Sequence, residues 1–330
     1  MPKVLHIGPC ESPGGMANVM RILAEHPPEG WDAELLSSHV EGSPWAKWRA
    51  YRRARATLAQ MLRDDTRRPD IVHLHTAADW SWWRKRRFAL LAHAGGCKIV
   101  VHIHSGKFDK WLANANSKKS RAMKSVLHKT AAKLIVLSEW WQEQLQPLIG
   151  DAIVIHNPVR NTFANSGGMR KRNHLLLLGR NDPVKGHNFA MTVCAKVREE
   201  ISELKVTMTG ITSSPYPWLE AKGWVSDEEK LNLLQTASLL LVPSAFEGEP
   251  MVVLEAISCG LPVLCSDRVH SLPTVIEVAP FENEAVWTSK IIHLLGEPTD
   301  SEHLKAHSSS FEIQVISAQW SNIYQSLLAE

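Results

Sequence analysis

Hydrophobic positions in the first half of the chain fall into short runs rich in β-branched residues, separated by longer segments with helical periodicity. The predicted strands cover residues 3–8, 33–39, 71–76, 98–105, 133–138 and 152–157. Helical patterns lie between these runs, such as those over 15–26, 45–66 and 115–131. Strands that alternate with helices in this way predict a parallel sheet with right-handed crossovers.

The same pattern starts again after a segment rich in Asn, Gly and basic residues, 157–173, which is typical of a linker. Predicted strands follow at 174–180, 205–210, 238–244 and 261–266, with helices at 187–202, 227–236 and 251–259. We therefore predict two doubly wound α/β domains, residues 1–160 and 161–311, that face each other across a cleft. Ligands of such sheets bind beyond the carboxyl ends of the strands, so residues directly after strands are the candidates.

Composition is that of an ordinary soluble protein, with 44% hydrophobic and 22% charged residues. No apolar run reaches the roughly 20 residues that a membrane span needs. The first residues, MPKVLHIGPC, favour a β-strand over a signal peptide. The five cysteines show no CxxC spacing, and we expect reduced thiols in a cytoplasmic protein.

Charge is distributed unevenly along the chain. Residues 47–133 hold 21 Lys and Arg against 5 Asp and Glu. The same region and its edge carry tryptophans at 45, 48, 80, 82, 83 and 111. Cations interleaved with indoles favour an anionic membrane surface or a lipid-linked partner over nucleic acid. A solvated basic face with half-buried tryptophans is the alternative.

Two further post-strand segments suit an anionic ligand. Gly14 and Gly15 lie between the first strand and a helix, where glycine permits a close approach of backbone N–H groups to a phosphate. A tight strand-to-helix turn explains the same pair without a ligand. Arg180 follows a strand directly and Lys185 comes five residues later. Two such cations suit a diphosphate, and the alternative is a pair of solvated loop side chains.

Two strands end in His-x-His, as His73 and His75 and as His102 and His104. Alternate residues of a strand share a face, so these side chains could bind a metal. Because no carboxylate or cysteine accompanies them, we expect no metal and one buried histidine in each pair. His104, followed by Ser105 and Gly106, is the best placed to hydrogen-bond a substrate hydroxyl or to transfer a proton.

The stretch SAFEGEPMVVLEAISCG, residues 244–260, joins a predicted strand to an apolar helix. Glu247 lies on the loop, while Glu255 lies in the helix with apolar residues around it. A carboxylate in that position can accept two hydrogen bonds from the neighbouring hydroxyls of a ribose. The helix N-terminus presents backbone N–H groups to sugar or phosphate oxygens.

This chain resembles retaining glycosyltransferases of family 4, which have the GT-B fold of two Rossmann-like domains. The resemblance rests on GRNDPVKG (179–186), on the pair Glu247 and Glu255 with seven residues between them, on the glycine pair and on HIHS (102–105). It extends over nearly the whole chain. The family often has Phe or Met where this chain has Glu249, whose role stays open, and a chain of 330 residues is compact for the family.

The resemblance implies a role for each matching residue. Arg180 and Lys185 would hold the diphosphate of a nucleotide-sugar donor, Glu255 its ribose, and Glu247 its sugar, stabilising positive charge at the anomeric carbon. His104 would contact the sugar. Gly15, with Gly14 beside it, would approach the phosphate. The remaining donor contacts would come from the turn at Val225, near the base, and from the amides at Pro250, Met251 and Val252. The terminal helix, about 312–330, would pack on the first domain.

The function implied is the transfer of a hexose from a nucleotide sugar to a glycan or lipid-linked acceptor, in bacterial surface polysaccharide assembly. UDP is the favoured nucleotide and GDP is the alternative. Arg and Lys would take the place of a metal, so no metal or other cofactor is expected. The enzyme would be cytoplasmic, at the inner face of the plasma membrane. A catalytically silent GT-B partner protein, and an epimerase or phosphorylase on the same fold, are the alternative functions.

Overall fold

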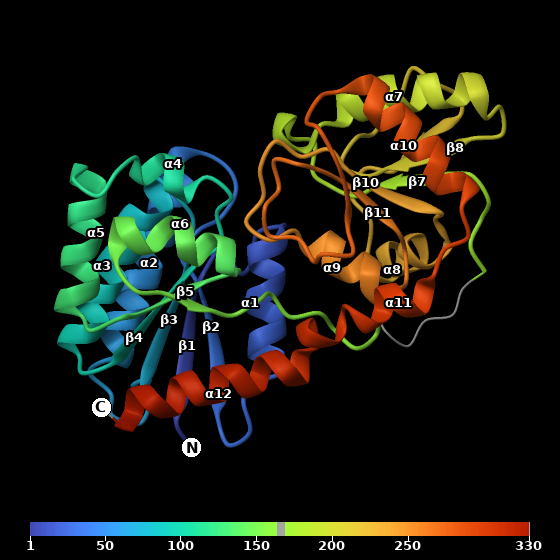
Figure 1. The fold of residues 1–330 in the computed structure, drawn as a ribbon. Coiled ribbons are helices and arrows are strands. Elements are labelled where there is room, and N and C mark those ends of the chain that lie inside the picture. The colour runs from blue at the N-terminus through green and yellow to red at the C-terminus, as the bar shows by residue number, and fades with distance from the viewer. Residues whose placement is uncertain (164–168, 330) are drawn as a thin grey trace. The chain divides into compact units, whose positions relative to one another are not determined.

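The computed structural model describes residues 1–163 and 169–329. It divides into two compact units, the first made of Met1–Pro158 and the segment from Ile313 onward, the second of Val159–Glu312. Figure 1 shows a sheet flanked by helices in each unit. The linker predicted over 157–173 falls partly on residues 164–168, which lie outside the described residues.

The first unit contains a six-stranded sheet in the order β2-β1-β3-β4-β5-β6, with every neighbouring pair parallel. Its strands are β1 (Lys3–Gly8), β2 (Asp32–Ser37), β3 (Ile71–Thr76), β4 (Lys98–Ile103), β5 (Lys133–Val136) and β6 (Ile153–Val154). Its helices are α1 (Gly15–Glu25), α2 (Pro44–Met61), α3 (Trp80–Ala94), α4 (Phe108–Leu112), α5 (Lys118–Lys129), α6 (Glu139–Ile149) and α12 (Ile313–Ala329).

The two faces of the first sheet differ in chemistry because side chains alternate along each strand. Leu5, Val72 and Val101 belong to a hydrophobic core shared with α2 to α6. The other face carries histidines and is contacted by α12, whose Trp320 and Tyr324 are buried.

The second unit contains a six-stranded sheet in the order β12-β11-β10-β7-β8-β9, again with parallel neighbours. Its strands are β7 (His174–Leu177), β8 (Lys205–Met208), β9 (Leu219–Ala221), β10 (Leu239–Val242), β11 (Val263–Ser266) and β12 (Glu277–Ala279). Its helices are α7 (His187–Glu200), α8 (Asp227–Thr236), α9 (Met251–Ser258), α10 (Glu284–Gly296) and α11 (Ser301–Ala306), with short 3₁₀ turns η1 (Pro183–Lys185) and η2 (Ser309–Phe311).

Both faces of the second sheet are covered, which explains why its strands are apolar without alternation. Leu176 and Leu240 point into a core with Val253, Leu254 and other residues of α8 and α9. A second core, on the opposite face, includes Leu175 and Leu241 together with residues of α7 and α10. The predicted class, two α/β units with parallel sheets, is confirmed. Among the described residues, no helix combines the length and apolar character needed to cross a membrane.

Candidate active site

Strand order in the second unit identifies where a ligand would bind. From β7 the chain proceeds to β8 and β9 on one side, and then to β10, β11 and β12 on the other. The β7/β10 boundary is therefore a topological switch point, where the loops after two adjacent strands separate and leave room for a ligand. Arg180 and Lys185 follow β7 and Glu247 follows β10, so the predicted residues lie on the two loops that flank this point.

Lys185 and Glu247 contact each other directly. The Lys185 ammonium donates to Glu247 Oε1 at 2.5 Å, and Ser244 Oγ donates to the same oxygen at 2.9 Å. Both ion-paired side chains are largely buried. The structure thus brings the predicted phosphate-binding cation and the predicted catalytic carboxylate together from positions 62 residues apart.

Glycine allows the two loops to approach so closely. Gly186 has φ of 72°, and a Cβ there would lie 2.7 Å from the carbonyl oxygen of Pro243 at the end of β10. The Ala245 amide also donates to the Val184 carbonyl at 2.9 Å, which ties the loop after β10 to the loop after β7. A side chain at position 186 would force the loops apart, and with them the Lys185–Glu247 pair.

Glu255 is buried within α9, with 1% of its surface exposed. Its Oε1 accepts from the Lys230 ammonium at 2.8 Å. Within the described residues its Oε2 has no hydrogen-bond partner. Burial raises the pKa of this carboxyl, and the Lys230 charge opposes that shift. A buried carboxylate oxygen without a partner can accept a hydrogen bond from a ligand hydroxyl.

The N-terminus of α9 is also open to a ligand. Pro250 is the N-cap residue and supplies no side-chain cap, and the Val253 amide donates to its carbonyl at 2.9 Å. The first amides of a helix, here those of Met251 and Val252, have no partner inside the helix and suit anionic or hydroxyl oxygens. Glu249, one residue before this N-cap, is buried.

The two remaining predicted donor-site residues of the second unit, Arg180 and Val225, differ in burial. The Arg180 side chain makes no polar contact in the described part of the chain. Arg180 is exposed on the loop after β7. Val225 is partly buried and packs against the core of α8 and α9, next to Trp224, whose side chain is 66% exposed.

In the first unit, Gly14 and Gly15 lie where the loop after β1 enters α1. Gly14 is the N-cap with φ of 130°, a conformation that side-chain-bearing residues rarely adopt, and nothing lies within 4 Å of a Cβ placed there. The turn therefore requires glycine at position 14 for its backbone, and the space beside it stays open. Both explanations of this pair, the tight turn and the close approach of a ligand, are compatible with that geometry.

The histidines of β1, β3 and β4, with His104 directly after β4, form one cluster of packed rings that contains two hydrogen-bonded series. His6 Nδ1 lies 3.0 Å from His75 Nε2, and His75 Nδ1 lies 3.0 Å from His104 Nε2. A second series runs from the Tyr324 hydroxyl to His73 Nδ1 at 2.8 Å and from His73 Nε2 to His102 Nδ1 at 3.3 Å. Sequence reasoning missed His6 and Tyr324, since neither belongs to a His-x-His pair.

The expectation of one buried histidine in each pair is wrong for the first pair. His73 and His75 are both buried, as is His102, because α12 covers this face of the sheet. Burial lowers the pKa of His104 to about 3. Its imidazole is therefore neutral at pH 7, so one ring nitrogen can donate a hydrogen bond and the other can accept one.

Two three-histidine sets could hold a metal ion by distance, His6, His73 and His75 in one and His75, His102 and His104 in the other, with one ligand atom from each within 4.8 Å of the others. Neither set includes a carboxylate to offset a divalent charge in a buried site. In each set two of the rings hydrogen-bond each other, and the third hydrogen-bonds a residue outside the set.

A buried lysine also went unnoticed in the sequence. Lys85 of α3 is 1% exposed, and its ammonium donates to Ser38 Oγ at 2.8 Å. Burial lowers its pKa to about 7, and the nearby Arg84 charge contributes to that shift. It lies within the run Arg84-Lys85-Arg86-Arg87, where the sequence alone does not distinguish it from neighbours that are partly or fully exposed.

Known proteins share both the sequence and the fold. Glycogen synthase of Mycobacterium tuberculosis is 26% identical over 306 residues, covering 82% of this chain and 72% of that protein. O-antigen chain mannosyltransferase B of Escherichia coli is 36% identical over 90 residues, which are 27% of this chain and 20% of that one. The pneumococcal O-GlcNAc transferase GtfA, solved with UDP and GlcNAc, has a TM-score of 0.65 at 16% identity. That comparison covers 79% of this chain and 57% of GtfA.

Family models match both halves of the chain. Residues 13–162 match the model described as Glycosyltransferase Family 4, and residues 159–305 match the one described as Glycosyl transferases group 1. Together with the structural likeness, these matches confirm the GT-B fold that the sequence motifs predicted. The chain belongs to the glycosyl transferases of group 1.

Proposed function

We propose that this glycosyltransferase moves a hexose, with retention of configuration, from a nucleoside diphosphate sugar to a glycan or lipid-linked acceptor. UDP is the favoured nucleotide, a choice supported by the UDP bound to the related fold of GtfA. No metal or other cofactor takes part in the proposed reaction. Assembly of a bacterial surface polysaccharide is the proposed setting, which fits the O-antigen mannosyltransferase among the relatives.

The observation that carries the proposal is the arrangement of charge at the β7/β10 switch point. Lys185 and Glu247 form an ion pair there, and Glu255 offers a buried carboxylate oxygen with no partner in the described residues. A nucleoside diphosphate sugar presents three matching groups, a diphosphate for the cations, a ribose for Glu255 and a sugar for Glu247. Arg180 is exposed and can fork two phosphate oxygens.

These charges match the charges that develop in transfer. As the bond between the anomeric carbon and the phosphate oxygen breaks, negative charge grows on the diphosphate and positive charge on the sugar ring. Lys185, Arg180 and the first amides of α9 stabilise the former, and Glu247 stabilises the latter. The acceptor oxygen then bonds to the anomeric carbon on the face that the diphosphate leaves, and its proton passes to the departing phosphate.

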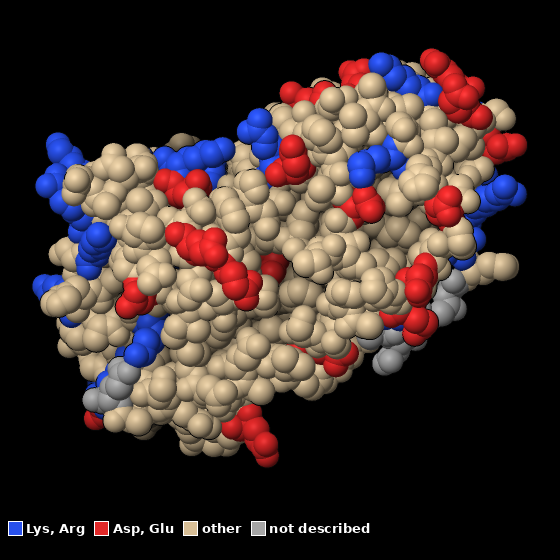
Figure 2. Space-filling model, in the orientation of Figure 1, with Lys and Arg blue, Asp and Glu red and all other residues tan. Residues whose placement is uncertain are grey.

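In the first unit, Gly14, Gly15 and His104 remain predicted contacts for the phosphate and sugar. The cations of residues 47–133 place the enzyme at an anionic membrane surface in this proposal. Figure 2 shows Lys and Arg side chains gathered at the edge of the first unit near α5, with Asp and Glu side chains elsewhere on the same face of that unit. The proposed location is accordingly the cytoplasm, at the inner face of the plasma membrane, and nucleic acid is not a proposed partner.

A thermal-shift panel tests the donor site directly. UDP, GDP, ADP and their common sugar conjugates are added to the full chain with and without EDTA. A ligand at about 100 times its Kd stabilises the folded protein by roughly 2.7 kcal/mol, an easily measured shift. We expect one nucleotide to raise the Tm of the wild type, in EDTA as well, and to raise that of Lys185→Ala much less.

Lys205→Ala is the matched control, since Lys205 is an exposed lysine at the start of β8, away from the carboxyl ends of the strands. It should respond to the nucleotide as the wild type does. A nucleotide shift that EDTA abolishes would refute metal independence. No shift with any nucleotide, in protein that unfolds cooperatively, would favour a catalytically silent partner protein instead.

A further inference from the structure

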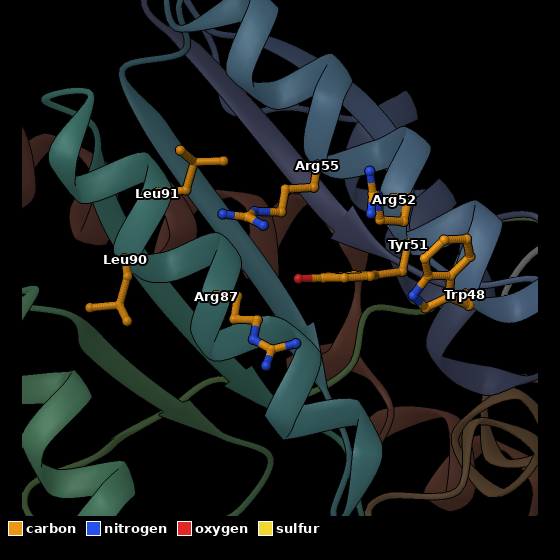
Figure 3. Close-up of a pocket in the computed structure, with 7 residues that line it drawn as sticks. All are labelled: Trp48, Tyr51, Arg52, Arg55, Arg87, Leu90 and Leu91. Carbon is orange, nitrogen blue, oxygen red and sulfur yellow. The ribbon is translucent and has the colours of Figure 1, made fainter.

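We propose that a pocket between α2 and α3 of the first unit binds the phosphate group of an anionic membrane lipid. This α2/α3 pocket has a volume of about 560 Å³ and is shown in Figure 3. It is lined by residues of α2 and α3, namely Trp48, Tyr51, Arg52, Arg55, Arg87, Leu90 and Leu91. The proposal assigns a specific site to the membrane part of the proposed function and makes no use of the donor site.

The lining carries three arginines that form no ion pair with an acidic side chain in the described part of the chain. These are Arg52, Arg55 and Arg87, and all three are exposed. An adjoining pocket of about 610 Å³ shares Trp48, Tyr51 and Arg87 and adds further cations. Those are Arg84, Arg86 and Lys119, and Asp79 is the acid among its lining residues in the described part of the chain. A phosphodiester carries one negative charge, which the guanidinium groups of Arg55 and Arg87 can neutralise while forming paired hydrogen bonds to its oxygens.

A buried hydroxyl in the pocket provides a second, independent indication of a ligand. Tyr51 is 7% exposed, and its hydroxyl has no hydrogen-bond partner within the described residues. Figure 3 shows the phenol reaching into the pocket, with the guanidinium groups of Arg55 and Arg87 to either side of it. A buried hydroxyl without a partner is unfavourable, and a phosphate oxygen that accepts its hydrogen would satisfy it.

Aromatic residues around the pocket favour a lipid over a soluble phosphate. Trp45, Trp48 and Trp80 are 62%, 51% and 77% exposed. Arg49 stacks over Trp45 with its guanidinium carbon 4.5 Å from the ring centre, and Arg52 stacks over Trp48 at 5.1 Å. Indoles of this kind lie at membrane interfaces, where the ring meets hydrocarbon and the polar edge meets headgroups. Leu90 and Leu91 extend the apolar lining of the pocket.

Vesicle flotation of the full chain tests the proposal. Vesicles of phosphatidylglycerol mixed with phosphatidylcholine are compared with vesicles of phosphatidylcholine alone. We expect binding to the anionic vesicles only. Arg55→Gln/Arg87→Gln should weaken it about thirtyfold, because each cation contributes about 1 kcal/mol. Tyr51→Phe keeps the charge and the ring and should weaken binding about fivefold through one lost hydrogen bond.

Arg63→Gln/Arg67→Gln is the control for diffuse charge, since it removes the same charge from exposed residues in the turn between α2 and β3. It should weaken flotation by less than about threefold. The pocket would be ruled out as the lipid site if the two double variants lost vesicle binding equally, or if Tyr51→Phe bound vesicles as the wild type does. A folded variant that still responds to nucleotide shows that any loss of flotation is local.

The source of the phosphate is tested with soluble ligands by calorimetry. Dihexanoyl phosphatidylglycerol below its micelle concentration should bind the wild type and lose affinity in Tyr51→Phe. If inorganic phosphate bound as tightly as this lipid, the ligand of the pocket would be free phosphate and the lipid proposal would be wrong. An RNA oligomer that displaces the protein from vesicles and depends on the same arginines would overturn it in favour of nucleic acid. Nucleotide binding in the second unit is independent of every one of these results.

Discussion

At the scale of single residues, the pair Glu255 and Lys230 shows what spacing can and cannot predict. Glu255 is the one charge in an otherwise apolar helix, and this contrast is visible in the sequence alone. Lys230 lies 25 residues earlier on α8 and donates to it at 2.8 Å. Because Glu255 is buried, its negative charge is favoured by this cation, which is hydrogen-bonded to Oε1, and to a lesser extent by the charge of Arg160. Its Oε2 has no hydrogen-bond partner among the described residues.

Removal of the cation should therefore be costly. We expect Lys230→Met to lower the free energy of unfolding by about 3 kcal/mol, since it leaves a buried charge uncompensated. Urea unfolding measures the change. The matched control is Lys290→Met, which breaks an exposed pair with Glu277 at 2.8 Å and should change stability by less than about 1 kcal/mol. Equal effects of the two variants would mean that Glu255 is uncharged in the folded protein.

At the scale of elements, three neighbouring strands carry the histidine cluster. His6 and His73 are register partners on β1 and β3, and His75 and His102 on β3 and β4. Strand alternation predicted that the members of each His-x-His pair share a face, and they do. The sheet order that brings His6 beside them is a tertiary property, because α1, β2 and α2 lie between β1 and β3 in the chain.

Acid should destabilise this sheet. Burial lowers the pKa of His6 to about 3. The unfolded chain takes up a proton near pH 6.5 whereas the folded chain does not, so the unfolding free energy falls as the pH drops from 6.5 toward 3. Between pH 6.5 and 5 this amounts to about 2 kcal/mol for each such histidine.

Urea unfolding at both pH values measures this loss. His6→Leu should lose about 2 kcal/mol less than the wild type across the interval. His128→Gln, at an exposed histidine on α5, should leave the loss unchanged. A wild type as stable at pH 5 as at pH 6.5 would contradict the neutral state of the cluster.

At the scale of the whole molecule, α12 belongs to the first unit although it follows the second in sequence. Trp320 and Tyr324 are buried against the histidine face, and the Tyr324 hydroxyl bonds His73. The first unit therefore includes α12 in its fold, and a substitution that disrupts the packing of α12 should lower the stability of that unit.

Hydrogen exchange can separate the two units. Trp320→Ala should lower stability by about 3–5 kcal/mol, and the amides of β3 and β4 should exchange faster in proportion. The amides of β7 and β10 should keep their protection. Val315→Ala, at an exposed position of the same helix, should alter neither set. Equal loss of protection in both sheets would show that the chain unfolds as one cooperative unit.

The amino-acid pattern alone predicted a parallel sheet in each half and the candidate residues at the carboxyl ends of its strands, although it did not predict β9 and β12, the short edge strands of the second sheet. Hydrophobic periodicity is a local property, and the loops after β7 and β10 carry Arg180, Lys185 and Glu247 wherever the sheets form. The tertiary structure alone decided which residues hydrogen-bond each other. These are Lys230 with Glu255, Tyr324 with His73, and Lys85 with Ser38. The tertiary structure also brings Arg87 of α3 to the pocket that Tyr51 and Arg55 of α2 line. Such contacts depend on strand order and helix packing, which bring together residues that no spacing in the sequence relates.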